Sequence, residues 1–188
     1  MPRADSYISG LIGTGASRTI VRSKTLTNLE AAALGNALRA DAADCYYSAW
    51  VSFLDAIHGV NKGFYTWAKV KLYYCVFYAF RASLSFDDVC AFHVGRAQFT
   101  VLSQAGASPV SCTDPGTHKA VMRTFQRQNP THPLLSQQID LQDAPDWFIE
   151  KRESANYGQG RFSEPECGAE FDFIPGQTHL NVLRGNAQ

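Results

Sequence analysis

The residues best suited to chemistry are basic and polar side chains at helical spacing. Arg152 and Asn156 are four residues apart, so a helix over this segment places both on one face, with Tyr157 beside them. Three polar residues from earlier in the chain could join them in a cleft: Lys71, Arg81 and His118. Because the guanidinium fork matches phosphate geometry, such a cleft would receive a phosphate or a nucleotide.

An internal polar network is the alternative interpretation of these residues. Arg81 or Arg152 would then bond a tyrosine hydroxyl, Glu153 or helix-end carbonyls, because a buried polar group without a partner costs about 1–3 kcal/mol. His118 falls in the first turn of a predicted helix, where the positive end of the helix dipole favours a neutral imidazole. A neutral histidine could still serve as a base. The residues alone leave both interpretations open.

An apolar segment, residues 67–84, must position several of these groups, and Lys69, Lys71 and Arg81 are embedded in it. Its hydrophobic residues occupy nearly every face of a helix, which predicts burial by neighbours on more than one side. Charges interrupt the run, and a bilayer-spanning helix needs ~20 uncharged residues. We therefore expect the central helix of a soluble helical domain.

A longer helix is predicted before this segment. Thr27 and Glu30 form a capping box, in which the hydroxyl and the carboxylate each satisfy an amide at the helix start. Apolar residues then repeat at helical spacing from Leu34 to Ile57, and Gly59 ends the run. The connection to the central helix is short, so the two helices are expected to be antiparallel.

The pattern changes to a β-hairpin at about residues 89–102. Residues 89–94 and 97–102 alternate and are rich in β-branched and aromatic side chains. Gly95 and Arg96 between them fit a two-residue turn of type II′, which has glycine first.

Two shorter helices are predicted after the hairpin. The first begins at a Thr117 cap and is stopped by Pro130. The second begins at Asp143, tolerates Pro145 in its first turn, and runs to about Tyr157.

The two ends of the chain lie outside this helical domain, which covers residues 25–157. Residues 1–24 have little apolar periodicity and are expected to form a flexible or docking arm. Residues 158–188 mix proline, glycine and acidic residues with phenylalanine and are expected to form an extended tail. The predicted fold is mainly α, an up-down helical bundle with an inserted hairpin.

Charge and cysteine content limit the function classes. Lys plus Arg (17) equals Asp plus Glu (17), so any contact with nucleic acid requires a local patch, and no membrane partner is expected. The five cysteines are scattered without a CxxC pair, which favours free thiols over disulfides or a zinc site. No secretory leader opens the chain, so we expect a cytoplasmic protein. No metal or cofactor is expected either.

Aromatic residues crowd the junction of the first two predicted helices. They are Tyr46, Tyr47, Trp50, Phe64, Tyr65, Trp67, Tyr73, Tyr74, Phe77, Tyr78 and Phe80. Interleaved with Lys62, Lys69 and Lys71, they could stack bases and neutralise RNA phosphates. Their helical spacing and the zero net charge favour the other interpretation, a core with a self-association surface.

Three segments carry motifs in a fixed order. Residues 71–82 read KLYYCVFYAFRA, residues 117–125 read THKAVMRTF, and residues 152–157 read RESANY. In this order they resemble the second, third and closing helices of bacterial members of the HEPN family, small helical-bundle domains of higher eukaryotes and prokaryotes. The resemblance covers roughly residues 30–157 and implies a HEPN-like bundle, with the hairpin and both ends outside it.

The resemblance implies two possible functions. Many HEPN proteins belong to toxin–antitoxin or anti-phage systems, and catalytic members are metal-independent ribonucleases with an arginine and a histidine four to six residues apart at a dimer cleft. Here the matching pair is Arg127 and His132. Arg127 would hold the scissile phosphate and stabilise its charge, and His132 would relay a proton. Pro130 interrupts the helix that would fix the geometry of the pair.

We therefore consider two hypotheses. The first is a HEPN-like accessory or binding module of a bacterial anti-phage defence or toxin-related assembly. It would be non-catalytic and act as a homodimer or on a partner protein, with RNA or a nucleotide as a further possible ligand. The second is a metal-independent endoribonuclease toxin that uses Arg127 and His132.

Overall fold

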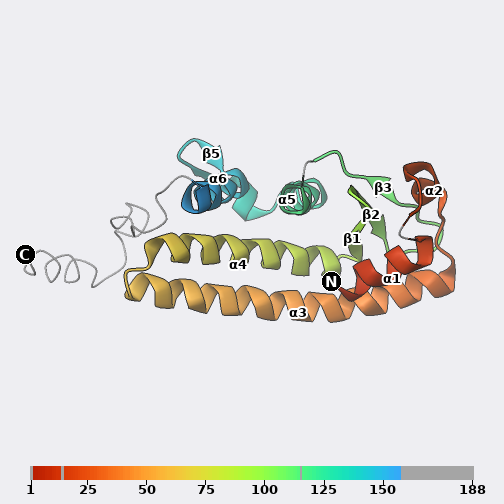
Figure 1. The fold of residues 1–188 in the computed structure, drawn as a ribbon, viewed down its shortest axis with the longest axis horizontal. Helices are drawn as coiled ribbons and strands as arrows, with labels where there is room; N and C mark the ends of the chain where they lie inside the picture. The colour runs from red at the N-terminus through yellow and green to blue at the C-terminus, as the bar shows by residue number, and fades with distance from the viewer. Residues whose placement is uncertain (1, 14, 115, 158–188) are drawn as a thin grey trace, which may run out of the picture. The chain divides into compact units, whose positions relative to one another are not determined.

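The computed structural model describes every residue except 1, 14, 115 and 158–188. The described residues are mainly helical, with six α-helices and two small antiparallel sheets (Figure 1). The chain forms two compact units: unit 1, Met1–Ala49 with Phe77–Ser136, and unit 2, Trp50–Val76 with Gln137–Gln188. Two long helices contribute a segment to each unit: α3 (Asn28–Asn61) and α4 (Tyr65–Phe86).

Unit 1 combines helices with a three-stranded sheet. The strands lie in the order β1 (Val89–Val94), β2 (Ala97–Leu102) and β3 (Val110–Ser111). Three α-helices and a 3-10 turn belong wholly to unit 1: α1 (Arg3–Ile12), α2 (Arg18–Ser23), α5 (Thr117–Gln128) and η1 (Pro133–Ser136). Its core includes Ile8, Val21, Leu34, Leu38, Phe92 and Phe99. The first two helices are therefore part of the core.

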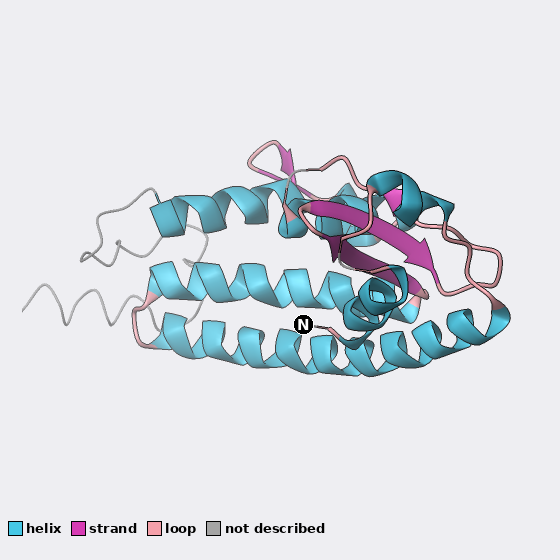
Figure 2. Cartoon of the chain, turned by 45° about the vertical axis from the view of Figure 1, so that its right-hand side comes forward, coloured by secondary structure: helices cyan, strands magenta, loops and turns pink. Residues whose placement is uncertain are grey.

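The predicted hairpin is confirmed residue for residue. β1 and β2 pair from Val89 with Leu102 to Val94 with Ala97, and Gly95 and Arg96 form the turn (Figure 2). Gly95 has a φ of +60°, as the first position of a type II′ turn requires, and glycine adopts this value without strain.

The start of α3 is confirmed as a capping box. The Thr27 amide donates to Glu30 Oε2 at 2.8 Å, and the Glu30 amide donates to Thr27 Oγ1 at 3.3 Å. Lys24 adds an ion pair to Glu30 Oε1 at 2.6 Å. Both Lys24 and the hydrogen bonds lower the pKa of the Glu30 carboxyl, which places a stable negative charge at the positive end of the helix.

Unit 2 contains the helical hairpin made by the end of α3 and the start of α4. Val60, Tyr65 and Ala68 form its buried cluster, with Leu72 packed against it. The unit also contains β4 (Gln138–Ile139), β5 (Gln142–Asp143) and α6 (Ala144–Tyr157). Helix α6 was predicted to begin at Asp143 and begins one residue later; the Asp143 Oδ1 accepts from the Asp146 amide at 2.9 Å and so caps it.

The prediction that the central helix is buried on more than one side is also confirmed. In unit 2 it buries Tyr65, Ala68, Val70 and Tyr73, and in unit 1 it buries Phe77, Phe80, Ala82 and Leu84. Each set spreads around the helix, since successive residues turn by about 100°.

Three local expectations need correction. The N-terminal segment, expected to be a flexible or docking arm, contains α1 and α2. Thr117 is the first residue of α5 and not its cap, because Gly116 holds the cap position and the Thr117 hydroxyl bonds elsewhere. Gly59 does not end α3, which continues to Asn61; a Cβ added at Gly59 would make ordinary van der Waals contact with Ala68, 3.5 Å away. The predicted tail lies outside the described residues.

No helix in the described part of the chain has the length and apolar character needed to cross a membrane.

A candidate functional site around His93

The site begins with α1, which a carboxylate from α3 fixes at its first turn. Asp41 Oδ1 accepts from the Arg3 amide and Oδ2 accepts from the Ala4 amide, both at 2.8 Å. These amides have no partner within the helix, so Asp41 replaces the side-chain cap that Pro2 cannot supply. Asp41 is only 5% exposed. By fixing the first turn of α1, the contact with Asp41 also sets the position of Asp5, which follows Ala4 in that helix.

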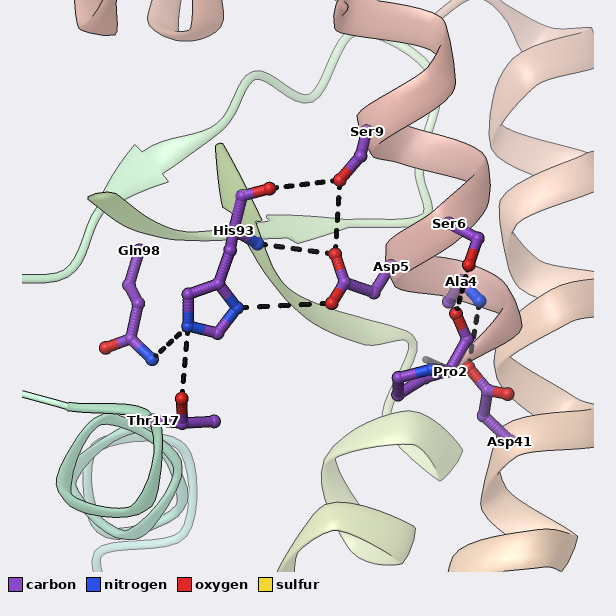
Figure 3. A network of polar contacts seen from close by, with 9 residues as sticks. All are labelled: Pro2, Ala4, Asp5, Ser6, Ser9, Asp41, His93, Gln98 and Thr117. Carbon is purple, nitrogen blue, oxygen red and sulfur yellow. Dashed lines mark hydrogen bonds and ion pairs between the residues drawn. The ribbon is translucent and has the colours of Figure 1, made fainter. Parts of the chain in front are cut away.

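Asp5 faces β1 and is held there by several contacts (Figure 3). Its Oδ1 accepts from the His93 amide at 3.3 Å and lies 3.1 Å from the Ser9 hydroxyl. That hydroxyl is also 3.0 Å from the His93 carbonyl oxygen. Ser9 is four residues after Asp5, so both lie on one face of α1. Helix α1 and β1 are thus joined by polar contacts at His93.

The His93 ring has oxygen atoms at both nitrogens. Asp5 Oδ2 lies 4.0 Å from Nδ1, which is an ion-pair distance but too long for a hydrogen bond. Thr117 Oγ1, at the start of α5, lies 3.2 Å from Nε2. The amide of Gln98, the cross-strand neighbour of His93, lies 2.7 Å from the same nitrogen.

The Gln98 amide satisfies more groups with its oxygen toward the ring, the opposite of the orientation drawn in Figure 3. In that orientation the oxygen accepts from His93 Nε2 at 2.7 Å and from the Thr117 amide at 3.1 Å. The nitrogen then donates to the Gly116 carbonyl at 3.3 Å. The donor and acceptor inventory favours this assignment. We call Asp5, Ser9, His93, Gln98 and Thr117 the His93 network.

Two hollows in unit 1 lie against the His93 network and share part of it as a common wall. Four residues line both: His93, Gln98, Cys112 and Thr117. The smaller hollow, about 160 Å³, is also lined by Asp5, Arg81 and Thr124. The larger, about 400 Å³, is also lined by Arg18, Arg96 and Asp114. The network is therefore accessible to a small ligand.

A histidine between a carboxylate and a hydroxyl is an arrangement that can move protons or orient a ligand. The Cys112 thiol beside it is not an activated nucleophile, because burial raises its pKa and leaves it protonated. Among the described residues, no group of three or more His, Cys, Asp and Glu side chains could hold a metal ion.

Arg127 and His132, predicted as a catalytic pair, have separate partners. The Arg127 guanidinium lies 3.4 Å from Asp114 Oδ2 and 3.2 Å from Thr124 Oγ1. His132 is exposed in the segment after α5, and its Nδ1 accepts from the Leu134 amide at 3.2 Å. Its ring packs edge-on against Phe125 with 5.2 Å between centroids.

Of the predicted binding residues, Arg81 and His118 lie in unit 1 and share one aromatic neighbour. The Arg81 guanidinium lies 5.8 Å from the centroid of the Phe77 ring, and the His118 ring stacks on Phe77 at 4.3 Å. Arg81 also lines the smaller hollow. The structure therefore brings these two side chains to a common aromatic ring.

Lys71 and Arg152 lie in unit 2, each over a different ring. Lys71 pairs with Asp55 at 2.8 Å and lies 5.5 Å from the Trp67 centroid. Arg152 lies 5.4 Å from the centroid of Tyr73. Burial raises the pKa of Tyr73 to about 12, against the opposing effect of the Arg152 charge. In unit 2 these two side chains therefore contact Asp55 and the faces of two aromatic rings.

The two remaining predicted residues, Asn156 and Tyr157, belong to α6, but their side chains lie outside the described part of the structure. Arg152 Nε, one turn earlier, is buried without a hydrogen-bond partner among the described residues.

Exposed apolar side chains line part of α3 in unit 2. Trp50, Val51, Phe53, Leu54 and Ile57, here called the α3 strip, are all exposed. Trp50 and Phe53 meet edge to face, with 6.0 Å between ring centroids. Phe64 and Trp67, after the turn, are exposed as well. An exposed apolar row of this kind usually marks a surface that another molecule covers.

The sequence interpretation did not identify the His93 network. One signal was available, because the hairpin register pairs His93 with Gln98 directly across the two strands. A second was the four-residue spacing of Ala4 with Ile8 and of Asp5 with Ser9, which is typical of a helix with one apolar and one polar stripe.

No protein-family model matches this sequence, and no match was found among curated proteins or solved structures.

Proposed function

We propose that the chain is a HEPN-like accessory or binding module of a bacterial anti-phage defence or toxin-related assembly. The proposal is supported by the sequence motifs together with the order of the helices that carry them. The three motifs fall on α4, α5 and α6, and the long helix α3 precedes them. Two long helices followed by two shorter ones is the order that the resemblance implies.

Binding is favoured over ribonuclease activity by the contacts of the two candidate catalytic residues. Arg127 already pairs with Asp114, and His132 Nδ1 accepts from a backbone amide. A catalytic pair needs both groups directed at one reacting phosphate. The segment after α5 gives each group a separate partner, which supports a non-catalytic role.

The α3 strip carries the binding proposal, and its occupant is a second copy of this chain. Together the partly exposed aromatic and aliphatic side chains give the strip an exposed area on the order of 400 Å², a size that is often functional on a monomer. Covering two such strips would bury roughly 800 Å² in total, and Phe64 and Trp67 would extend this toward a small stable interface. The strip is apolar and uncharged, with two aromatic and three aliphatic side chains, as the centre of a self-complementary interface requires.

The test replaces Leu54, which is 61% exposed at the strip, with lysine. We expect Leu54→Lys to weaken dimerisation by about tenfold or more, because each dimer would bury two charges. Leu29→Lys is the matched control, since Leu29 is 81% exposed on the same helix but outside the strip. Sedimentation equilibrium over a concentration series measures the dissociation constant. The unfolding free energy of Leu54→Lys should stay within about 0.5 kcal/mol of the wild type.

Self-association through this surface is wrong if the wild type stays monomeric at all concentrations, or if both variants weaken dimerisation equally. The same preparations distinguish the nuclease alternative. If the wild type cleaves RNA in EDTA and His132→Ala does not, the chain is a metal-independent ribonuclease and the accessory proposal is rejected.

A further inference from the structure

The larger hollow beside the His93 network carries an inference beyond the proposed function. Its volume is about 400 Å³, and four elements line it: α2, the hairpin, the segment around β3, and the start of α5. We propose that it binds a small phosphate monoester, with Arg18 and Arg96 as the residues that hold the phosphoryl group.

The charge of the hollow favours a dianion. Arg18 is contributed by α2 and Arg96 by the hairpin turn, so two arginines far apart in sequence line one space. Within the described residues, neither arginine has an ion-pair partner. The acidic residue in the lining, Asp114, is paired with Arg127 at 3.4 Å, which offsets its charge. Two guanidinium groups match a phosphate dianion in both charge and geometry.

Hydroxyl groups complete the lining. Ser111, Thr113 and Thr117 border the hollow and can donate to phosphate oxygens or to hydroxyls of the organic part. His93 and Gln98 form the wall on the side of the His93 network, where mutual hydrogen bonds hold them in place. A volume of about 400 Å³ is within the usual range for small-molecule sites and leaves room for more than the phosphoryl group.

Rigid and flexible parts of the site have different roles. The wall made by His93, Gln98 and Thr117 is fixed before the ligand arrives, so little ordering is needed on that side. Arg18 and Arg96 are exposed, and they can close on the ligand from the open side. The ligand is therefore expected to order the two arginines and not the wall.

The experiment measures binding of ribose 5-phosphate, inorganic phosphate and ribose by isothermal titration calorimetry at constant ionic strength. We expect both phosphates to bind and neutral ribose not to bind. If inorganic phosphate binds and ribose 5-phosphate does not, the hollow is a site for the free ion and the monoester assignment is wrong. Tighter binding of ribose 5-phosphate than of inorganic phosphate indicates that the organic part is also recognised.

Variants of α2 give a matched pair. Arg18→Gln should weaken binding of ribose 5-phosphate about tenfold, because one charge-assisted contact is lost. Arg22→Gln should change it less than about twofold, since Arg22 is exposed on the same helix but does not line the hollow. Arg96→Gln should match Arg18→Gln, and neither should alter the circular dichroism spectrum.

The proposal is overturned if the wild type binds neither phosphate. It is also overturned if Arg18→Gln and Arg22→Gln weaken binding equally, because attraction by general positive charge would then explain the result. Dimerisation through the α3 strip is measured separately, so either proposal can fail while the other stands.

Discussion

Around α1, unit 1 buries two carboxylates, whereas on α3 unit 2 leaves a row of apolar side chains exposed. Asp5 and Asp41 in unit 1 are each 8% exposed or less, and Leu54 in unit 2 is 61% exposed. Buried polar groups and exposed apolar patches are the informative departures from the usual distribution of side chains. The two carboxylates can be buried because hydrogen-bond donors within unit 1 satisfy them. The side chains of the α3 strip, in contrast, are left exposed by unit 2.

The difference teaches where each region obtains its stability. In unit 1 the buried Asp41 carboxylate holds α1 in place, and its loss would leave the Arg3 and Ala4 amides without partners. In unit 2 the strip contributes little to folding, and its apolar area remains available for association. Substitutions in unit 1 should therefore change unfolding, and substitutions on the strip should change association.

The largest effect is expected at Asp41. Asp41→Ala should lower the unfolding free energy by about 3 kcal/mol, because the Arg3 and Ala4 amides both lose a charged acceptor. Urea unfolding followed by circular dichroism measures the change, and hydrogen exchange should show loss of protection in α1.

Asp44→Ala is the matched control for Asp41→Ala. Asp44 contacts the Arg3 guanidinium at 2.8 Å, but both side chains are more than half exposed. An exposed ion pair contributes at most about 1 kcal/mol and often nothing measurable. Equal destabilisation by the two variants would contradict the importance of the buried cap and remove one side of the comparison.

A smaller effect is expected at Thr117, at the edge of the His93 network. Thr117→Val keeps the shape of the side chain and removes the hydroxyl that lies 3.2 Å from His93 Nε2. We expect a loss of about 1 kcal/mol in unfolding free energy, since Gln98 still bonds the same nitrogen. Thr19→Val, at an exposed position of α2, is the control and should change it by less than about 0.5 kcal/mol. The His93 side-chain nitrogen resonances should shift in Thr117→Val alone, and an unchanged spectrum would argue against the contact.

Sequence reasoning was most successful where a structure depends on neighbouring residues. The Thr27 capping box and the Gly95 turn each lie within a few residues, and both are confirmed. The cap on α1 was beyond this reasoning, because Asp41 is 37 residues from Ala4 along the chain. The His93 network has the same difficulty, since α1, the hairpin and α5 each supply part of it.

Exposure of Phe53 and Ile57 was unexpected for a geometric reason. Leu34, Leu38 and Ala42 repeat at helical spacing and are buried, but Phe53 and Ile57 continue the same pattern and are exposed. A step of four residues turns an α-helix by about 400°, so each step moves the pattern about 40° around the axis. After several steps the pattern leaves the buried face. Periodicity locates an apolar stripe, but the neighbours of the helix decide how much of it is covered.

The smallest effect is expected at Glu30, where a polar contact of unit 1 lies at the surface. The pKa of its carboxyl is lowered in the folded protein by Lys24 and by the hydrogen bonds of the capping box. A lowered folded pKa means that the charged form stabilises the fold above the unfolded pKa of about 4.3, and that this contribution is lost as the pH falls through the folded pKa. Glu30→Gln should therefore be less stable than the wild type at pH 7. The difference in unfolding free energy should shrink as the pH falls from about 4.3 through the folded pKa of Glu30. Urea midpoints at a series of pH values measure this, and Lys24→Met should remove part of the same difference, because Lys24 is the largest cause of the shift. If the difference in stability between wild type and Glu30→Gln does not change with pH, the charge of the Glu30 carboxylate contributes nothing to stability. Burial alone would then distinguish the Asp41 contacts from the polar contacts at the surface of unit 1.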